Sequence, residues 1–275
     1  MIRIAVAVAT ADALPSAFVV WRDIEESIRK AAEFGYEGIE LALQSTDQVD
    51  ADRVEGLLEE KGLGCPTVST GQVFAGSNLY FTARDKEKRR EVIRVFQGMV
   101  DLAERLGAMV NVGRARGFVE EGEPVEEAED RFIRVARQLA AYAEPKGVEL
   151  ILEPVNRYEI NFVNSVAEGA DLLRKVGAPN LGLMPDLFHM NIEDASLGGV
   201  LRAHADLVRY IHFADSNRLA PGRGHTDFRL VLDALKRVDY DGWVGVEILP
   251  EPDPDTAARQ AIDALRPLVE EYNRA

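Results

Sequence analysis

The chain of 275 residues has little of what several protein classes require. It holds a single cysteine, Cys65, so no disulfide can form within the chain. Lys and Arg number 32 against 47 Asp and Glu, which gives a formal net charge of −15 at pH 7. Proteins that bind the phosphate backbone of nucleic acids need a basic surface, so we expect no nucleic-acid partner.

Long apolar runs are absent as well. No segment of the sequence approaches the roughly 18 consecutive apolar residues of a membrane-spanning helix. The apolar N-terminus has one charged residue, Arg3, and begins with an alternation of apolar and polar residues. We therefore interpret it as the first strand of a domain and not as a signal peptide. We therefore expect a cytoplasmic protein with no membrane partner. At 47% hydrophobic residues, the chain can bury a sizeable core.

Short apolar runs that predict β-strands alternate with amphipathic stretches along the whole chain. The predicted strands cover residues 2–9, 38–42, 65–69, 108–112, 148–153, 181–186, 208–213 and 243–249. The predicted helices cover residues 23–34, 52–60, 86–106, 124–143, 165–176, 228–238 and 255–272, and a weaker pattern fits 197–205. Eight strand–helix units predict an α/β fold, a (β/α)₈ TIM barrel, as a single domain over residues 1–275.

Four of the predicted strands end on a side chain that can bind a metal ion: Glu153, Asp186, His212 and Glu247. The differences 186 − 153, 212 − 186 and 247 − 212 are 33, 26 and 35 residues, each the length of one strand–helix unit. Because parallel barrel strands present their C-terminal ends at one rim, we expect these side chains to converge there. Three carboxylates packed together repel one another, so they need a cation that offsets their charge. Together with an imidazole they form a site for a hard divalent cation.

Histidine is scarce too, with four in the chain. His189, His212 and His225 fall at strand ends or in the loops that follow strands, on the expected active face, whereas we expect His204 to lie exposed on a helix. The connections 71–84 and 216–226 are longer than a barrel needs, so we expect binding loops or lids. Cys65 has no histidine near it in sequence, which favours a buried structural thiol over a nucleophile.

Several motifs in the C-terminal half are specific in combination. They are LEPVNRYEINFVN at 152–164, DLFHMN at 186–191, HFADSNR at 212–218, PGRGHTDF at 221–228 and GVE at 245–247. With them the chain resembles the xylose-isomerase-like barrels and, among these, the ketose 3-epimerases, most closely the 5-keto-L-gluconate epimerases. The N-terminal half agrees more loosely, through TGQ at 70–72 and GRARG at 113–117.

The resemblance implies a role for each matching residue. Glu153, Asp186, His212 and Glu247 match the ligands of a divalent cation, most often Mn²⁺, with Mg²⁺ or Co²⁺ as alternatives. Glu153 and Glu247 also match the family's catalytic acid/base pair. The residues that match positions holding the substrate's carbonyl end and hydroxyls are Glu159, His189 and Arg218. Relatives often form homodimers or homotetramers, so the resemblance permits either state.

Two departures from the family pattern are visible in the sequence. Leu187 stands where related chains often carry Thr, and Tyr210 stands where some carry a second His. Neither departure removes a predicted ligand, although either one changes the surroundings of the ligands.

The residue types fit the expected chemistry. Inverting C3 of a ketose requires removal of a proton beside the C2 carbonyl and return of a proton to the opposite face. A divalent cation polarises the carbonyl, and two carboxylates on the two faces can serve as base and acid. We therefore predict an isomerase, a metal-dependent epimerase of a ketose or keto-sugar acid. A substrate carboxylate would be recognised by one of the arginines Arg114, Arg116, Arg157, Arg218 or Arg223.

The sequence leaves other functions open. A metal-dependent dehydratase of a keto-inositol or keto-sugar acid removes a similar proton and then expels a hydroxyl. An epimerase of neutral ketoses, of the D-tagatose or D-psicose type, would use the same residues. An aldose–ketose isomerase is less favoured, because it would need two metals and usually an active-face lysine, which the strand ends and loops lack. A DNA-repair endonuclease is disfavoured, because it would need more histidine ligands and a basic surface. A non-catalytic sugar-binding barrel would be favoured by loss of a ligand, but all four are present.

Overall fold

The computed structural model describes residues 1–14 and 18–274, and within them eight parallel strands form a TIM barrel. The strands are β1 (Ile2–Ala9), β2 (Gly38–Ala42), β3 (Gly64–Ser69), β4 (Met109–Val112), β5 (Leu150–Leu152), β6 (Leu181–Leu183), β7 (Tyr210–His212) and β8 (Gly242–Val246). Their order in the sheet is β6-β5-β4-β3-β2-β1-β8-β7. Two isolated parallel bridges, Leu183 with Val208 and Asp186 with His212, close the barrel between β6 and β7.

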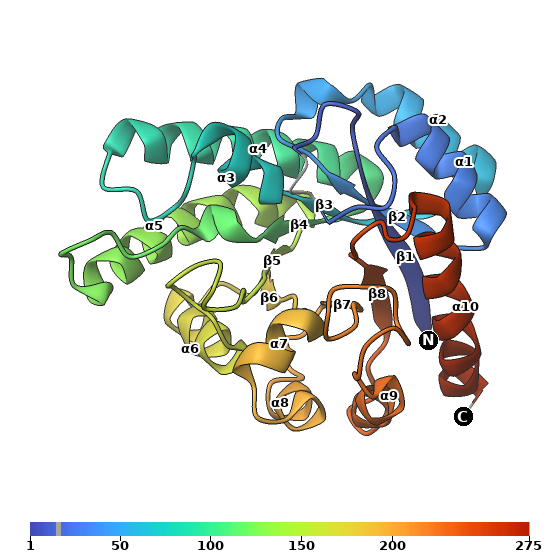
Figure 1. The fold of residues 1–275 in the computed structure, drawn as a ribbon. Coiled ribbons are helices and arrows are strands. Elements are labelled where there is room, and N and C mark those ends of the chain that lie inside the picture. Colours follow the sequence, from blue (N-terminus) through green and yellow to red (C-terminus); the bar gives the residue numbers. More distant parts are fainter. Residues whose placement is uncertain (15–17, 275) are drawn as a thin grey trace.

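Helices surround the strands on the outside of the barrel (Figure 1). They are α1 (Ile24–Phe34), α2 (Ala51–Lys61), α3 (Gly71–Ser77), α4 (Lys86–Leu106), α5 (Val125–Ala143), α6 (Val166–Val176), α7 (Leu187–Glu193), α8 (Leu197–Ala203), α9 (Phe228–Lys236) and α10 (Pro254–Arg274). The short 3₁₀ helices are η1 (Thr46–Gln48), η2 (Arg114–Arg116) and η3 (Glu144–Lys146). Local sequence sets the boundaries: α6 starts at a capping box of Ser165 and Glu168 and ends at Gly177, whose φ is 72°.

The predicted TIM barrel is confirmed, with differences at the ends of elements. The predicted strands 148–153, 181–186 and 243–249 extend too far, because Glu153, Asp186 and Glu247 lie just beyond the last strand residues. Two short helices were not predicted. Helix α3 occupies the first half of the expected loop 71–84 and contains two glycines, which disfavour helix. Helix α7 is too short for a clear period, and its N-cap is Asp186, whose side chain accepts a hydrogen bond from the backbone N–H of Phe188 at 2.8 Å.

Two buried layers of side chains hold the C-terminal ends of the strands in place. The larger core lies between strands and helices and includes Ile4 and Val6 of β1. Alternate residues of the strands point the other way and form a second buried cluster with Ile151, Met184 and Tyr210. The barrel interior is therefore packed with side chains, and polar groups take over toward the C-terminal ends of the strands.

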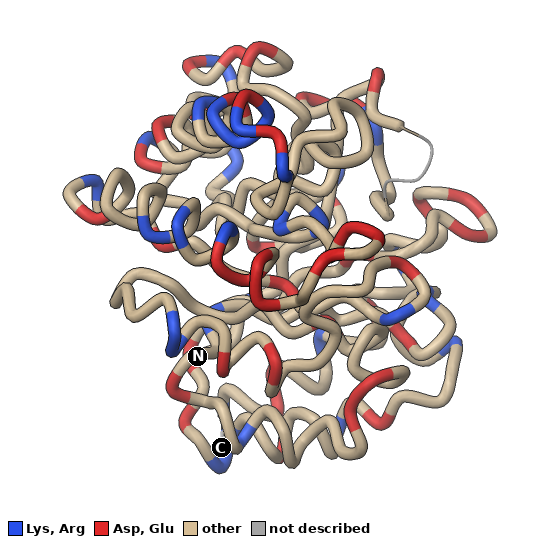
Figure 2. The backbone as a smooth tube through the Cα atoms, turned by 90° about the vertical axis from the view of Figure 1, so that its left-hand side faces the viewer, with Lys and Arg blue, Asp and Glu red and all other residues tan. Residues whose placement is uncertain are grey.

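The outer surface mixes charges of both signs. In the view of Figure 2, segments of acidic and of basic residues are interspersed along the backbone. Several oppositely charged side chains form ion pairs, as Lys175 does with Glu129 at 2.8 Å. Cys65 is buried, as expected, and burial followed by the nearby Glu40 charge raises the pKa of its thiol to about 12. None of the helices formed by the described residues has the length and apolar character needed to cross a membrane.

Candidate metal centre and active site

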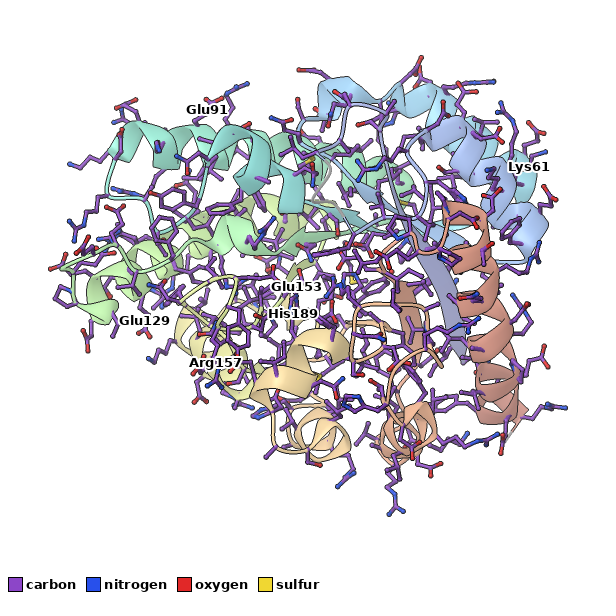
Figure 3. All side chains as sticks on the ribbon, viewed as in Figure 1. Lys61, Glu91, Glu129, Glu153, Arg157 and His189 are labelled. Carbon is purple, nitrogen blue, oxygen red and sulfur yellow. The ribbon has the colours of Figure 1, made fainter. Side chains whose placement is uncertain are left out.

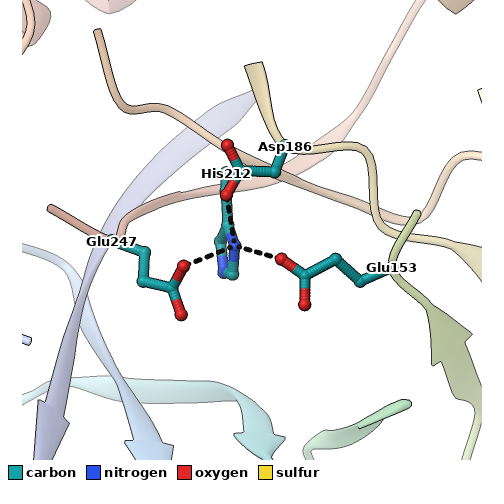
Figure 4. Close-up of side chains that lie close together, drawn as sticks. All are labelled: Glu153, Asp186, His212 and Glu247. Atoms are coloured by element: carbon teal, nitrogen blue, oxygen red, sulfur yellow. Dashed lines mark ion pairs between the residues drawn. The ribbon is translucent and has the colours of Figure 1, made fainter. Parts of the chain in front are cut away.

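The four predicted ligands converge at the C-terminal rim of the barrel. Glu153 follows β5, Asp186 follows β6, His212 is the last residue of β7 and Glu247 follows β8. One ligand atom from each lies within 4.8 Å of the others. Glu153 and Glu247 approach the His212 imidazole from opposite sides, and Asp186 approaches it from a third direction (Figure 4).

The geometry of this cluster fits a divalent cation. The Nδ1 atom of His212 lies 3.5 Å from an oxygen of Glu153, 3.5 Å from one of Asp186 and 3.6 Å from one of Glu247. His212 Nδ1 is buried without a hydrogen-bond partner in the described part of the chain. Such orphaned polar atoms are uncommon in folded proteins. Three carboxylates and an imidazole nitrogen are a suitable donor set for Mn²⁺ and similar ions.

The two glutamates titrate differently in the protein alone. Burial, together with the negative charges of Glu153 and Asp186, raises the pKa of Glu247 to about 8 against the opposing charges of Arg218 and His212. Burial also opposes ionisation of Glu153, but the adjacent His212 imidazole holds the pKa of Glu153 below its ordinary value. These directions belong to the metal-free protein, because a cation bound by both carboxyl groups would favour the ionised form of each.

The predicted substrate-binding residues line the same pocket as the two glutamates. The pocket, which is open to solvent, is bordered by Glu159, His189, Arg218, Glu153 and Glu247. Figure 3 shows Glu153 and His189 close together near the middle of the barrel. The His189 Nδ1 atom lies 3.9 Å from Glu159, and burial lowers the pKa of His189, so its neutral form is favoured.

Arg218 connects the pocket wall to the ligand cluster. Its Nη1 atom lies 2.8 Å from Asp186 Oδ2, and its Nη2 atom also pairs with Glu247. The guanidinium lies between the rings of Phe18 and Phe188, with its central carbon 4.4 and 4.9 Å from the ring centroids. Aromatic faces attract a cation electrostatically, so this packing orients Arg218.

The structure narrows the five arginine candidates for a substrate carboxylate to two. Arg114 and Arg218 line the pocket. Arg116 is fully buried and donates to backbone carbonyls instead. Arg157 is exposed and pairs with Glu193 at 2.6 Å, and Arg223 donates to Gln260 at 3.0 Å. These three arginines do not line the pocket, so the structure favours Arg114 and Arg218 for recognition of a substrate carboxylate there.

The remaining histidines lie away from the cluster. His225 is exposed, its Nδ1 atom is 2.8 Å from Ser216 Oγ, and it does not line the pocket. His204 was expected to be exposed but is half-buried at the end of α8, and its Nδ1 atom is buried. Position in a predicted helix alone did not reveal which face His204 occupies.

The two long connections contribute unequally. The buried carboxylate of Asp215 fixes the connection 216–226 by accepting hydrogen bonds from the backbone N–H groups of Ser216, Gly222 and Thr226 at 2.7, 2.8 and 3.0 Å. From this connection, Arg218 reaches the pocket. In the connection 71–84, Gly71 and Gln72 of α3 border the pocket.

Sequence reasoning missed several polar residues that touch the predicted site. Glu40 lies within β2, and its Oε2 atom is 2.9 Å from His212 Nε2. Asn111, in β4, donates to Glu153 Oε2 at 3.2 Å, and Asn156 lies 2.7 Å from His189 Nδ1. For Glu40 and Asn111 a signal was available, because each is a polar residue within a strand that is otherwise apolar.

Comparison with known proteins agrees with the architecture. A family model described as xylose isomerase-like TIM barrel matches residues 28–268. The L-ribulose 3-epimerase of Methylomonas sp. (strain DH-1) is 32% identical over 226 residues, which cover 81% of this chain and 77% of that protein. The 3-dehydro-D-guloside 4-epimerase of Escherichia coli (strain K12) is 33% identical over 135 residues, 49% of this chain and 50% of that protein.

A solved structure extends the likeness over almost the whole chain. The D-allulose 3-epimerase from Methylomonas sp. in complex with D-allulose matches with a TM-score of 0.82 at 26% identity, covering 96% of this chain and 97% of that chain. These relatives are named as epimerases of sugars. The extent of the family match and the identity to the L-ribulose 3-epimerase establish that the chain belongs to the xylose isomerase-like TIM barrel family.

Proposed function

We propose that this protein is a divalent-metal-dependent epimerase that inverts C3 of a ketose or keto-sugar acid. The observation that carries the proposal is the placement of two glutamates, Glu153 and Glu247, on opposite sides of the point where Asp186 and His212 converge (Figure 4). A carbon held between two carboxyl groups can lose a proton to one and gain a proton from the other, which inverts its configuration.

In this proposal, Glu153, Asp186, His212 and Glu247 hold the cation, with Mn²⁺ as the expected ion. The bound cation supplies Lewis-acid polarisation of the substrate carbonyl. One glutamate takes the proton from C3 to give an enediolate, and the other delivers a proton to the opposite face. Their roles exchange when the reaction runs backward.

Other pocket residues hold the substrate during these proton transfers. Arg218 and His189 can donate hydrogen bonds to oxygens on which negative charge develops. Glu159 can accept from a substrate hydroxyl, and Asn111 orients the Glu153 carboxylate through its 3.2 Å hydrogen bond. Each of these side chains borders the same cavity as the two glutamates.

Two observations bear on the substrate class. The relatives named for L-ribulose and D-allulose favour a neutral ketose. Arg114 favours a keto-sugar acid such as 5-keto-L-gluconate or D-tagaturonate, because it is half-buried in the pocket wall and its ion pair with Glu159 is long, at 3.9 Å. A substrate panel must therefore contain both classes.

Proton exchange in D₂O tests the proposal directly. The Mn²⁺-loaded protein is incubated with 5-keto-L-gluconate, D-tagaturonate, D-tagatose, D-fructose and L-ribulose; the Mn²⁺ is then removed by chelation and the sugars are analysed by NMR. Deuterium at the carbinol carbon beside the ketone, which is C3 of the ketoses and C4 of 5-keto-L-gluconate, together with the epimer at that carbon, is the expected result. Loss of water to a deoxy-diketo product would assign the protein to the dehydratases instead. Metal binding without exchange in any compound would refute epimerisation of these substrates.

A matched pair of variants gives the internal control for this assay. Glu149→Gln changes a glutamate at the opposite end of β5 from Glu153, where Glu149 pairs with Arg209 at 2.9 Å. We expect Glu149→Gln to exchange deuterium at the rate of the unmodified protein. Glu153→Gln should exchange none above background, so a difference between the two variants isolates the carboxylate in the pocket.

A further inference from the structure

Glu40 is a carboxylate buried in the middle of a strand. It belongs to β2, its side chain has no exposed surface, and its neighbours Ile39 and Leu41 are buried apolar residues. Burial of a carboxylate is costly unless hydrogen bonds and a positive charge offset the lost hydration. An apolar residue would fill this position without that cost, so the carboxylate needs a reason beyond packing.

The hydrogen bonds of Glu40 lead to the ligand cluster. Its Oε2 atom lies 2.9 Å from His212 Nε2, and Ser69 Oγ donates to its Oε1 atom. In the sheet order, β1 and β8 separate β2 from β7, so Glu40 reaches His212 across the barrel interior. Among the described residues, His212 is the one side chain with which Glu40 forms an ion pair.

This contact determines which nitrogen of His212 can bind a cation. A neutral imidazole carries one N–H donor and one lone-pair acceptor. A carboxylate accepts hydrogen bonds, so Glu40 stabilises the form with the proton on Nε2. The lone pair then lies on Nδ1, the atom that faces Glu153, Asp186 and Glu247 at 3.5–3.6 Å.

We infer that Glu40 is a positioning residue that fixes the ring orientation and tautomer of His212 so that Nδ1 can bind the divalent cation. The inference rests on the proposed function, because it presupposes the metal site. A carboxylate behind a ligating histidine also raises the basicity of the ligand, and loss of such a partner typically weakens metal affinity about 10- to 100-fold. Ser69 is part of the same chain of contacts, since its hydroxyl orients Glu40.

Metal affinity tests the inference without relying on turnover. The metal-stripped protein, Glu40→Gln and Thr67→Val are titrated with Mn²⁺, and the EPR signal of free Mn²⁺ reports binding. Thr67 is the matched control, because it is fully buried on β3 beside Glu40 and its hydroxyl has no hydrogen-bond partner among the residues that the structure describes. We expect about 10- to 100-fold weaker binding in Glu40→Gln and unchanged binding in Thr67→Val.

A second readout reports the tautomer itself. With Mg²⁺ in place of paramagnetic Mn²⁺, long-range ¹H–¹⁵N spectra of protein labelled at its four histidines distinguish Nε2–H from Nδ1–H rings. We expect His212 as the Nε2–H form in the unmodified protein and a smaller fraction of that form in Glu40→Gln, because the neutral amide oxygen is a weaker acceptor and the amide NH₂ group can donate to Nε2 instead. If Glu40→Gln does not fold, Glu40→Asp takes its place, since it keeps the charge but withdraws the carboxylate by one methylene. It should also bind Mn²⁺ more weakly.

The possible results separate this inference from the proposed function. Folded Glu40→Gln or Glu40→Asp with the Mn²⁺ affinity and His212 tautomer of the unmodified protein would overturn the role of Glu40 and leave the epimerase proposal intact. An unmodified protein that binds no Mn²⁺ would overturn the metal-dependent function, and the role of Glu40 with it. Equal weakening in Thr67→Val would assign the effect to core packing and would also overturn the inference.

Discussion

Replacing Arg116 by methionine should destabilise the protein severely, although the residue lies in a loop with an arginine two positions before it. The Arg116 side chain is fully buried, and it donates to the backbone carbonyls of Phe162, Glu153, Val163 and Gly113 at 2.8, 2.9, 3.0 and 3.1 Å. Burial lowers its pKa to about 10, so it is still protonated at pH 7. The cation ties the chain after β4 to the chain after β5.

The size of the effect follows from which carbonyls lose their donor. Gly113 O also accepts from Arg116 N at 3.0 Å, and Val163 O accepts from Val155 N at 3.4 Å, so these two keep a partner. The carbonyls of Phe162 and Glu153 keep no other donor in the described part of the chain. At about 1–3 kcal/mol for each buried acceptor left without a donor, the loss is about 2–6 kcal/mol. That is a large part of the roughly 5–15 kcal/mol that holds a typical protein folded.

Denaturant unfolding of Arg116→Met and Arg114→Met measures this difference, with the buried Trp21 and Trp243 as fluorescent probes. The methionine side chain preserves the apolar stem, so the comparison isolates the guanidinium. Arg114 is half-buried and makes one ion pair at 3.9 Å, so its replacement should cost less than about 1 kcal/mol. A loss below about 1 kcal/mol in Arg116→Met, or equal losses in the two variants, would refute the reasoning.

Three further predictions concern the half-buried acid Asp194, the acid/base pair and the metal. Burial and the charge of Glu193 raise the pKa of Asp194 to about 6, so the folded state binds its proton more tightly than the unfolded chain, and stability falls as pH rises from about 4 to 6. The Asp194→Asn variant should therefore be more stable than the unmodified protein by about 1–2 kcal/mol at pH 7.5, a value that is already reduced for partial exposure. The gain should vanish near pH 4. Denaturation curves that show the same gain at every pH would contradict this. Glu153→Gln and Glu247→Gln should each lower kcat at least about 100-fold in an NMR epimerisation assay, and near-full activity in either would remove that residue from the catalytic pair. Chelation with EDTA should abolish activity and Mn²⁺ should restore it, whereas activity retained after verified metal removal would exclude a metal-dependent reaction.

The alternation of strands and helices was readable because each unit is local. Strands buried on both faces are short apolar runs, and the helices that cover them have an apolar stripe, so the barrel follows from patterns that span about 30 residues. Glu153, Asp186, His212 and Glu247 were identifiable for the same reason. Each interrupts an apolar run at its end, and the end of a barrel strand has a known place in the fold.

Elements without a local signature were not predicted. Helix α7 has seven residues, too few to show a period, and α3 contains glycines that disfavour helix. The sequence also did not show which of the polar loop residues are buried, and burial decides their role. Arg114 and Arg116 stand in one short loop with similar neighbours, yet one borders the pocket and the other is enclosed by carbonyl groups.

The sequence by itself determined the barrel, the order of its strands and helices along the chain, and four candidate ligands, because periodicity and strand ends are properties of neighbouring residues. The tertiary structure alone decided which polar groups face one another across the barrel. Glu40 and His212 are 172 residues apart and meet at 2.9 Å only because β2 and β7 turn their side chains into the same interior. That contact depends on closure of the whole sheet, and no local pattern encodes the distance between two strands that are not neighbours.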